Sequence, residues 1–284
     1  MIVRRAAVMG RCMGVKRAVD MALAAAGAAE DVFTLGPLIH NPQAVADLEA
    51  SGVRALSDDE IDERVEGRKV VLRAHGVPPA LRERLAALGA EIVDATCPRV
   101  LASQRKAAAY AAKGWQVVIA GEKGHGEVAG IAGHAPGAAV VDGPEEARAL
   151  AASLGPRLGG RPVALIAQTT IRKEEYEAVR AALAERFGVL EVVDSICPCT
   201  EERLEALADL AAEVDAIVVV GGRNSANTAR LLARARDSGR PSWLVETAAE
   251  LPEGIGAYAR VGLAAGASTP ERLVAEVEEA LLAL

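Results

Sequence analysis

The sequence is poor in aromatic residues and carries no surplus of positive charge. Its 284 residues include two Phe, two Trp and three Tyr, and the formal net charge is −7. Proteins that bind single-stranded nucleic acids stack bases on aromatic side chains, and phosphate backbones attract basic surfaces. Both absences argue against nucleic acid as a partner.

Long apolar segments are also missing. No charge-free apolar run approaches the ~20 residues that a membrane-spanning helix needs. The N-terminal MIVRRAAVMGRC lacks the apolar stretch and small-residue cleavage site of a secretory signal. We therefore expect a cytoplasmic protein with no membrane partner. Disulfides are rare in that compartment, so the cysteines are interpreted as buried thiols, metal ligands or nucleophiles: Cys12, Cys97, Cys197 and Cys199.

Three of these cysteines mark an internal repeat. Each follows a predicted short apolar strand (AAVM, EIVDAT, VVDSI) and precedes a helical stretch and a second strand. A glycine stands 24 residues after each cysteine, at Gly36, Gly121 and Gly221. A polar residue follows 28 residues after each cysteine, at His40, His125 and Ser225. A further strand then ends in another polar loop, which contains His75, Thr169–Thr170 or Ser268.

Strands that alternate with helices predict parallel sheets built from right-handed βαβ units. We therefore expect an α/β fold of three pseudo-symmetric modules, at residues 1–96, 97–196 and 197–284. Ligands bind beyond the carboxyl ends of the strands in such sheets. The cysteines and the polar loops all fall at those ends, so the repeat predicts that they face one centre.

A lone cysteine is usually a small buried hydrophobe, but packing alone does not explain three at equivalent positions of a repeat. A helix N-terminus favours the thiolate that a metal requires. Three thiolates without a nearby fourth protein ligand favour a 4Fe–4S cluster with one open iron over a structural zinc site.

The histidines follow the same pattern. Three of the four, His40, His75 and His125, fall in the polar loops, whereas His134 lies outside them and is interpreted as a surface residue. Together with Ser225, Asn227 and Ser268 they suit an anion-binding site at helix N-termini. The alternative is that these residues only cap helices. Glu127 likewise either complements a helix dipole or donates protons.

Nine motifs in order over essentially the whole chain resemble the 4-hydroxy-3-methylbut-2-enyl diphosphate reductase (IspH or LytB) family: GRCMGVKRA, IHN, RAHGV, DATCP, GHGEV, QTT, DSIC, NSAN and AGAST. The resemblance implies a three-module cloverleaf around a central 4Fe–4S cluster held by Cys12, Cys97 and Cys197. It also allows the N-terminal strand to pack with the third module rather than the first.

The resemblance further implies a substrate that is an allylic alcohol with a diphosphate. The residues that match the family's diphosphate ligands are His40, His75, His125, Ser225, Asn227 and Ser268. Glu127 would deliver protons and Thr169 would orient the hydroxyl group. Two protons, with two electrons from a ferredoxin or flavodoxin, would remove that hydroxyl as water and give isopentenyl and dimethylallyl diphosphates.

Four positions depart from the family pattern. Arg11 stands where an aromatic residue is usual, Gly126 where proline is usual, and Ala226 where a second serine is usual. The fourth, Cys199, is interpreted as an inert buried thiol, with contact to the cluster as the alternative. Because the departures lie around the substrate, two other functions stay open. One is a reductase or dehydratase of another oxygenated anion on the same threefold plan, as in quinolinate synthase. The other is a cluster that senses iron or redox state.

Overall fold

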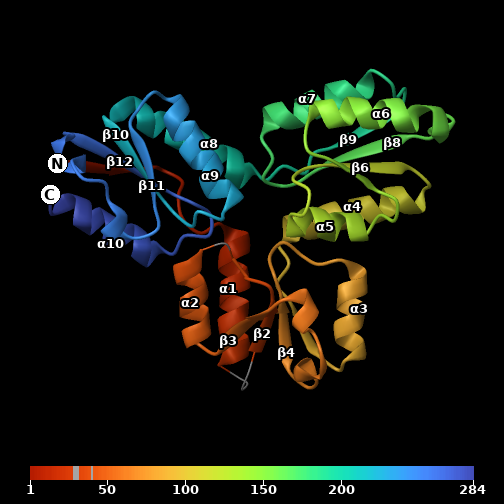
Figure 1. Ribbon diagram of the computed structural model, residues 1–284, viewed down its shortest axis with the longest axis horizontal. Coiled ribbons are helices and arrows are strands. Elements are labelled where there is room, and N and C mark those ends of the chain that lie inside the picture. The colour runs from red at the N-terminus through yellow and green to blue at the C-terminus, as the bar shows by residue number, and fades with distance from the viewer. Residues whose placement is uncertain (28–31, 40) are drawn as a thin grey trace. The chain divides into compact units, whose positions relative to one another are not determined.

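The computed structural model describes residues 1–27, 32–39 and 41–284. These residues form three four-stranded sheets with helices between the strands (Figure 1). The strand pairs of all three sheets run parallel, so the predicted α/β fold of three parallel-sheet modules is confirmed. His40 lies outside the described residues.

The three sheets share one strand order. The first is β3-β2-β4-β5, the second β7-β6-β8-β9 and the third β11-β10-β12-β1. The strands are β1 (Ile2–Arg5), β2 (Val32–Leu35), β3 (Val53–Leu56), β4 (Lys69–Leu72), β5 (Glu91–Asp94), β6 (Gln116–Ala120), β7 (Ala139–Val141), β8 (Val163–Ala167), β9 (Leu190–Val193), β10 (Ala216–Val220), β11 (Ser242–Val245) and β12 (Arg260–Ala265).

The strand that leads to each cysteine is the last strand of a sheet. β5 precedes Cys97, β9 precedes Cys197, and β1 precedes Cys12. β1 pairs in parallel with β12, with Ile2 opposite Arg260. The N-terminal strand therefore belongs to the sheet of the third module, while the module boundaries at 96/97 and 196/197 stay a prediction.

Two expectations about strands were wrong. The segment AAVM does not form the strand before Cys12, because β1 ends at Arg5, whose guanidinium pairs with Glu271 and Glu278. Gly10, at a φ of 71°, then turns the chain toward Cys12. The repeat also omitted the edge strands β3, β7 and β11, which are only three or four residues long.

Helices lie between the strands of each sheet. They are α1 (Met13–Ala26), α2 (Pro42–Ala50), α3 (Pro79–Ala87), α4 (Pro98–Ala112), α5 (Gly126–Gly133), α6 (Pro144–Leu158), α7 (Lys173–Ala184), α8 (Pro198–Glu213), α9 (Ala226–Asp237) and α10 (Glu271–Leu282), with short 3₁₀ turns at Asp58–Glu60, Glu63–Val65, Ala248–Glu250 and Ile255–Ala257. Side chains of Cys12, Asn41 and Ser225 cap α1, α2 and α9.

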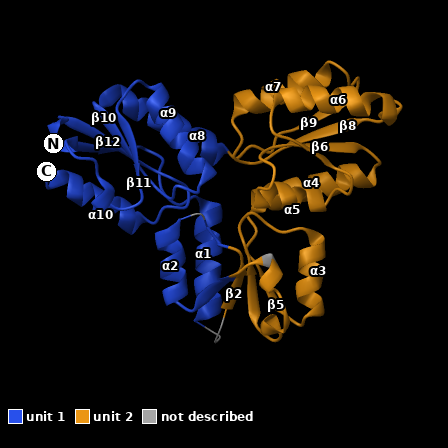
Figure 2. Cartoon of the chain, viewed as in Figure 1, with its two compact units in different colours: residues 1–30, 37–55, 198–284 blue, residues 31–36, 56–197 orange. Residues whose placement is uncertain are grey.

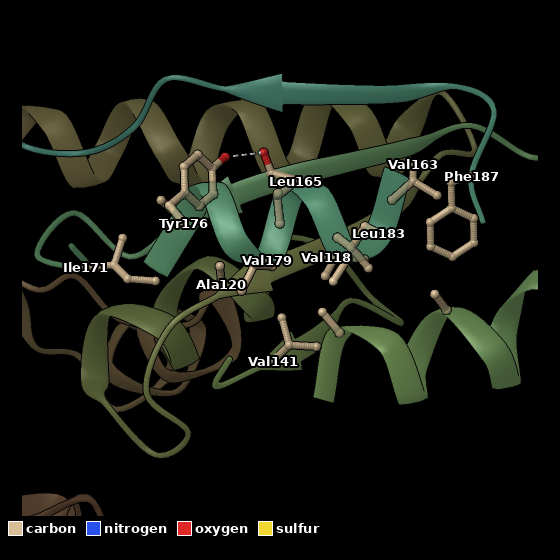
Figure 3. Packing of buried hydrophobic residues seen from close by; sticks show 14 residues of the cluster. Val118, Ala120, Val141, Val163, Leu165, Ile171, Tyr176, Val179, Leu183 and Phe187 are labelled. Carbon is tan, nitrogen blue, oxygen red and sulfur yellow. Dashed lines mark hydrogen bonds between the residues drawn. The ribbon is translucent and has the colours of Figure 1, made fainter. Parts of the chain in front are cut away.

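The second sheet shows how the apolar strands build a core. Successive residues of β6 point to opposite faces, so Val117 and Ile119 pack with α4 and α5, whereas Val118 and Ala120 pack with α6 and α7. Figure 3 shows the latter cluster, in which the Tyr176 hydroxyl lies 2.8 Å from the Leu165 carbonyl oxygen and 2.9 Å from that of Val193. Covering on both faces explains why these strands are continuously apolar.

The chain forms two compact units (Figure 2). Unit 1 comprises residues 1–30, 37–55 and 198–284, and unit 2 comprises residues 31–36 and 56–197. Unit 1 contains the whole third sheet and unit 2 the whole second sheet. Among the helices that the structure describes, none combines the length and the apolar character needed to cross a membrane.

Candidate functional site

Each of the three predicted ligand cysteines stands at the start of a long helix. Cys12 is the N-cap of α1, where its Sγ accepts a hydrogen bond from the Val15 N–H at 3.5 Å. Cys97 is the N-cap of α4, and Cys197 directly precedes α8. All three are half-buried free thiols. Peptide N–H groups at a helix N-terminus favour an anion, so these positions suit thiolates.

One backbone hydrogen bond recurs at all three cysteines. The N–H of Cys12 donates to the Ala267 carbonyl, that of Cys97 to Ala74, and that of Cys197 to Thr169, at 3.2, 2.9 and 2.8 Å. Ala267 and Ala74 directly precede Ser268 and His75 in their loops. Each cysteine is therefore tied to the polar loop of the neighbouring strand, and in each case the two bonded residues belong to different predicted modules.

The chain just before Cys97 is held by Asp94. The carboxylate accepts a hydrogen bond from the Thr96 N–H at 3.0 Å and pairs with Arg82 at 2.7 Å. Burial opposes ionisation of Asp94, but the hydrogen bonds from Thr96 and Arg82 outweigh it and lower the pKa of the carboxyl. Before Cys197, the chain is held by Ser195, whose hydroxyl accepts from the Ala167 N–H at 2.8 Å.

Unit 2 brings four predicted site residues into two pairs. The rings of His75 and His125 meet edge to face, with 5.2 Å between their centroids. His125 is the N-cap of α5, and its Nδ1 accepts from the Glu127 N–H at 3.2 Å. The Glu127 carboxylate accepts two hydrogen bonds from Thr169, one from the N–H at 2.6 Å and one from the hydroxyl at 2.9 Å.

The second pair, Glu127 and Thr169, is buried. The exposed fraction is 2% for Glu127 and 6% for Thr169. A buried carboxylate is costly unless it is hydrogen-bonded, and Thr169 supplies a donor to each of its oxygens. The arrangement holds a carboxyl group in a fixed position at the carboxyl end of β8, where it can exchange a proton with a bound ligand.

Unit 1 holds the remaining described candidates. Ser225 caps α9, with its Oγ accepting from the Thr228 N–H at 3.3 Å. The Asn227 side-chain nitrogen is buried and finds no hydrogen-bond partner among the described residues. Ser268 is buried at the end of the loop that follows β12. The two serines and Asn227 thus lie at strand ends and a helix N-terminus, where backbone N–H groups also favour anions.

Arg203 contacts the chain next to the predicted ligand cysteines, a contact that the sequence pattern did not reveal. Its guanidinium is 4% exposed and donates to the carbonyls of Gly10 and Cys199, each at 2.8 Å. It therefore links the loop before Cys12 to the first turn of α8. A signal was present, because Arg203 stands among Thr200, Leu207 and Leu210 on the buried face of α8, where a charged residue is unusual.

The departures from the family pattern have distinct surroundings. Arg11 is half-buried, its Nε is buried without a partner in the described chain, and burial lowers its pKa against the attraction of Asp47 and Asp20. Ala226 is the first residue of α9, beside the capping Ser225. Cys199 is a half-buried free thiol in the first turn of α8.

The donor set suits an iron–sulfur group, because three free thiols occupy equivalent helix starts. Cys12 belongs to unit 1, whereas Cys97 and Cys197 belong to unit 2. Within the part of the chain that the structure describes, no three His, Cys, Asp or Glu side chains gather as a metal site.

The fold and these residues define a three-module α/β protein that presents a thiol and a polar loop together at the carboxyl ends of its parallel strands, where α/β enzymes bind ligands. The sequence profile of the LytB protein family matches residues 3–282. The chain therefore belongs to the LytB family, and the predicted family is confirmed.

Relatives and solved structures agree with this assignment. The protein of Treponema denticola named 4-hydroxy-3-methylbut-2-enyl diphosphate reductase is 45% identical over 289 residues, which cover 99% of each chain. A structure of (E)-4-hydroxy-3-methyl-but-2-enyl diphosphate reductase, the terminal enzyme of the non-mevalonate pathway, is 36% identical, with a TM-score of 0.75 and all of both chains covered. The E-1-hydroxy-2-methyl-but-2-enyl-4-diphosphate reductase from Plasmodium falciparum shares the fold at a TM-score of 0.87 and 24% identity, covering 98% of this chain and 87% of that one.

Proposed function

We propose that this protein is an oxidoreductase that removes the hydroxyl group of 4-hydroxy-3-methylbut-2-enyl diphosphate and forms isopentenyl and dimethylallyl diphosphates. The observation that carries the proposal is membership of the LytB family over residues 3–282, with 45% identity to a protein named as this reductase. The retained thiols and polar loops support the same reaction.

We assign Cys12, Cys97 and Cys197 as the ligands of a 4Fe–4S cluster. Their support is the repeat, in which all three are half-buried free thiols at helix starts. When bound, such a cluster supplies electrons and Lewis acidity. Because all four cysteines are free thiols, a reducing compartment such as the cytoplasm suits the protein, and a ferredoxin or flavodoxin is the proposed electron donor.

The diphosphate would be bound by His40, His75, His125, Ser225, Asn227 and Ser268. The described members of this set lie at strand ends and helix N-termini, and two of them, His75 and His125, touch each other in unit 2. Imidazole, hydroxyl and amide groups all donate hydrogen bonds to phosphoryl oxygens. An acidic protein, of net charge −7, needs such a local group of donors to hold an anion.

Glu127 is the proposed proton donor, and Thr169 the residue that orients it and the substrate hydroxyl. The two hydrogen bonds from Thr169 fix both carboxylate oxygens. Glu127→Gln keeps the shape of the side chain but removes its acidic proton, so substrate binding should persist while turnover is largely lost. Normal turnover by that variant would refute the assignment of Glu127.

The reaction is tested with protein purified without oxygen. Addition of 4-hydroxy-3-methylbut-2-enyl diphosphate should oxidise a reduced viologen dye and yield both products by mass spectrometry. A dehydratase of a different anion consumes no electrons, so it would leave the dye reduced. If protein with a full iron–sulfur content does not oxidise the dye when substrate is added, the proposed function is refuted.

The ligand assignment has a matched control in the chain itself. Cys197 and Cys199 are both half-buried free thiols two residues apart. Cys197→Ser should lose the cluster absorbance and iron content, whereas Cys199→Ser should keep both. Mössbauer spectra with and without substrate should show one distinct iron that responds to substrate. Four equivalent irons, indifferent to substrate, would instead mean that Cys199 caps the cluster.

A further inference from the structure

Arg73 places a guanidinium beside the histidines of unit 2. It follows β4 directly and stands two residues before His75. A Cβ atom built on Gly126 would lie 2.9 Å from its Nη2, and one built on Gly36 would lie 3.0 Å from its Nη1. The guanidinium therefore lies against two glycines, one at the end of β2 and the other in the first turn of α5.

This guanidinium lacks an anionic partner in residues 1–27, 32–39 and 41–284. Its Nε is buried and makes no hydrogen bond there, and no carboxylate among the described residues forms an ion pair with it. Arg73 is half-buried, and a charge that is partly removed from water is more stable when it is paired. The oxygens of Glu127, one residue beyond Gly126, are engaged by Thr169. An anion from outside the chain would complete the site.

The neighbouring groups define which anion fits. Gly126 begins α5, so the guanidinium lies at a helix N-terminus, where N–H groups favour anions. His125 caps that helix and touches His75. A guanidinium offers a planar fork of donors that matches phosphoryl oxygens. Guanidinium, imidazoles and helix N-terminus together suit a phosphoryl group rather than a neutral ligand.

We propose that Arg73 binds a phosphoryl oxygen of the substrate's diphosphate and that Gly126 is the residue that admits its guanidinium. The inference deepens the proposed function and rests on it for the identity of the substrate. A side chain at position 126 would press on the guanidinium, because its Cβ would lie 2.9 Å from Nη2, and the flexible end of Arg73 would shift to relieve the contact. Glycine at position 126, where the family usually has proline, leaves this space to the guanidinium.

The first test measures binding of inorganic diphosphate by calorimetry, together with KM and kcat for the substrate, on the cluster-loaded protein. Arg73→Met keeps the aliphatic stem but removes the charge. Because a hydrogen bond to a charged group contributes about 1.5–3 kcal/mol, Kd and KM should rise about 10- to 100-fold. The matched control is Arg105→Met, which removes an exposed arginine of α4 and should leave both constants unchanged.

The second test uses Gly126→Ala. Alanine is a better helix former than glycine, so this variant should keep or raise the melting temperature while weakening diphosphate binding about tenfold or more. In an Arg73→Met background, the same change should have almost no further effect on binding, because the displaced group is already gone. Additive losses would mean that Gly126 acts independently of Arg73.

The outcomes separate the two proposals. Wild-type protein that reduces the substrate, while Arg73→Met retains the wild-type Kd and KM, overturns the role of Arg73 and leaves the proposed function intact. If the wild type binds diphosphate and Arg73→Met does not, but the wild type fails to reduce the substrate, the anion site is supported and the proposed function is overturned. Coupled losses in the Arg73 and Gly126 variants support the inference.

Discussion

The hydrogen bond between the Thr169 hydroxyl and Glu127 offers a direct test of the proton-donor assignment. Thr169→Val replaces that hydroxyl with a methyl group of nearly the same shape. It leaves the backbone N–H bond to the other carboxylate oxygen in place, at 2.6 Å. The variant therefore removes one donor, at 2.9 Å, from a carboxylate that is 2% exposed, and leaves the carboxyl group where it was.

The size and sign of the effect follow from that lost donor. A hydrogen bond to a charged group contributes about 1.5–3 kcal/mol. Since the bond favours the ionised carboxylate, its loss raises the pKa of Glu127. A general acid acts in its protonated form, so activity should persist to higher pH. At about 1.4 kcal/mol per pH unit, the alkaline limb of kcat/KM should move upward by about one to two units.

The assay is the pH profile of kcat/KM for Thr169→Val beside that of Thr170→Val. Thr170 is the adjacent threonine, and its hydroxyl accepts a hydrogen bond from the Gln168 side chain instead. Its replacement should leave the alkaline limb in place. If Thr169→Val does not move that limb, or if Thr170→Val moves it equally, Glu127 is not the group whose protonation governs turnover.

Three further predictions concern the supports around the site. Arg203→Met removes both hydrogen bonds that tie the Gly10 loop to α8. In the cluster-free protein, Cys12 should then react with a thiol reagent about tenfold faster or more. An unchanged reaction rate would refute this link. Asp94 has a lowered pKa despite its burial. Its carboxylate therefore stabilises the fold at pH values above the ordinary carboxyl pKa, and this stabilisation is lost as the pH falls through the lowered pKa. Between about pH 6 and pH 3, the melting temperature of the wild type should therefore fall more steeply than that of Asp94→Asn. Tyr176→Phe removes the buried hydroxyl that lies between β8 and β9, which should cost about 1 kcal/mol and lower the melting temperature by about 2–4 °C.

The repeat was readable because parallel strands place their functional residues at one end. The recurrence of glycine 24 residues after each cysteine predicted β2, β6 and β10, and the structure places them at those positions. The edge strands could not be found in this way. β3, β7 and β11 are three or four residues long and partly exposed, as in VRAL and AVV, and such short runs do not show the alternation that distinguishes a strand from a loop.

The first strand was misplaced for a related reason. IVRR reads as a polar segment, although Arg4 and Arg5 form ion pairs with glutamates distant in sequence. Partners of that kind are invisible to local periodicity, so the apolar AAVM was the more strand-like choice. The same limit applies to the pairing of Glu127 with Thr169, which joins residues 42 positions apart.

The arginines show why composition could not reveal the electrostatics of the site. The chain carries a net charge of −7, yet Arg11, Arg73 and Arg203 each bury an Nε that lacks a partner among the described residues. Each stands near a predicted functional residue in sequence: Arg11 precedes Cys12, Arg73 precedes His75 by two positions, and Arg203 follows Cys197 by six. A positive charge that is partly or fully buried is unfavourable unless negative groups lie near it. The proposed thiolate ligands, cluster and diphosphate would bring such negative charge, so an acidic overall composition is compatible with the proposed binding of anions.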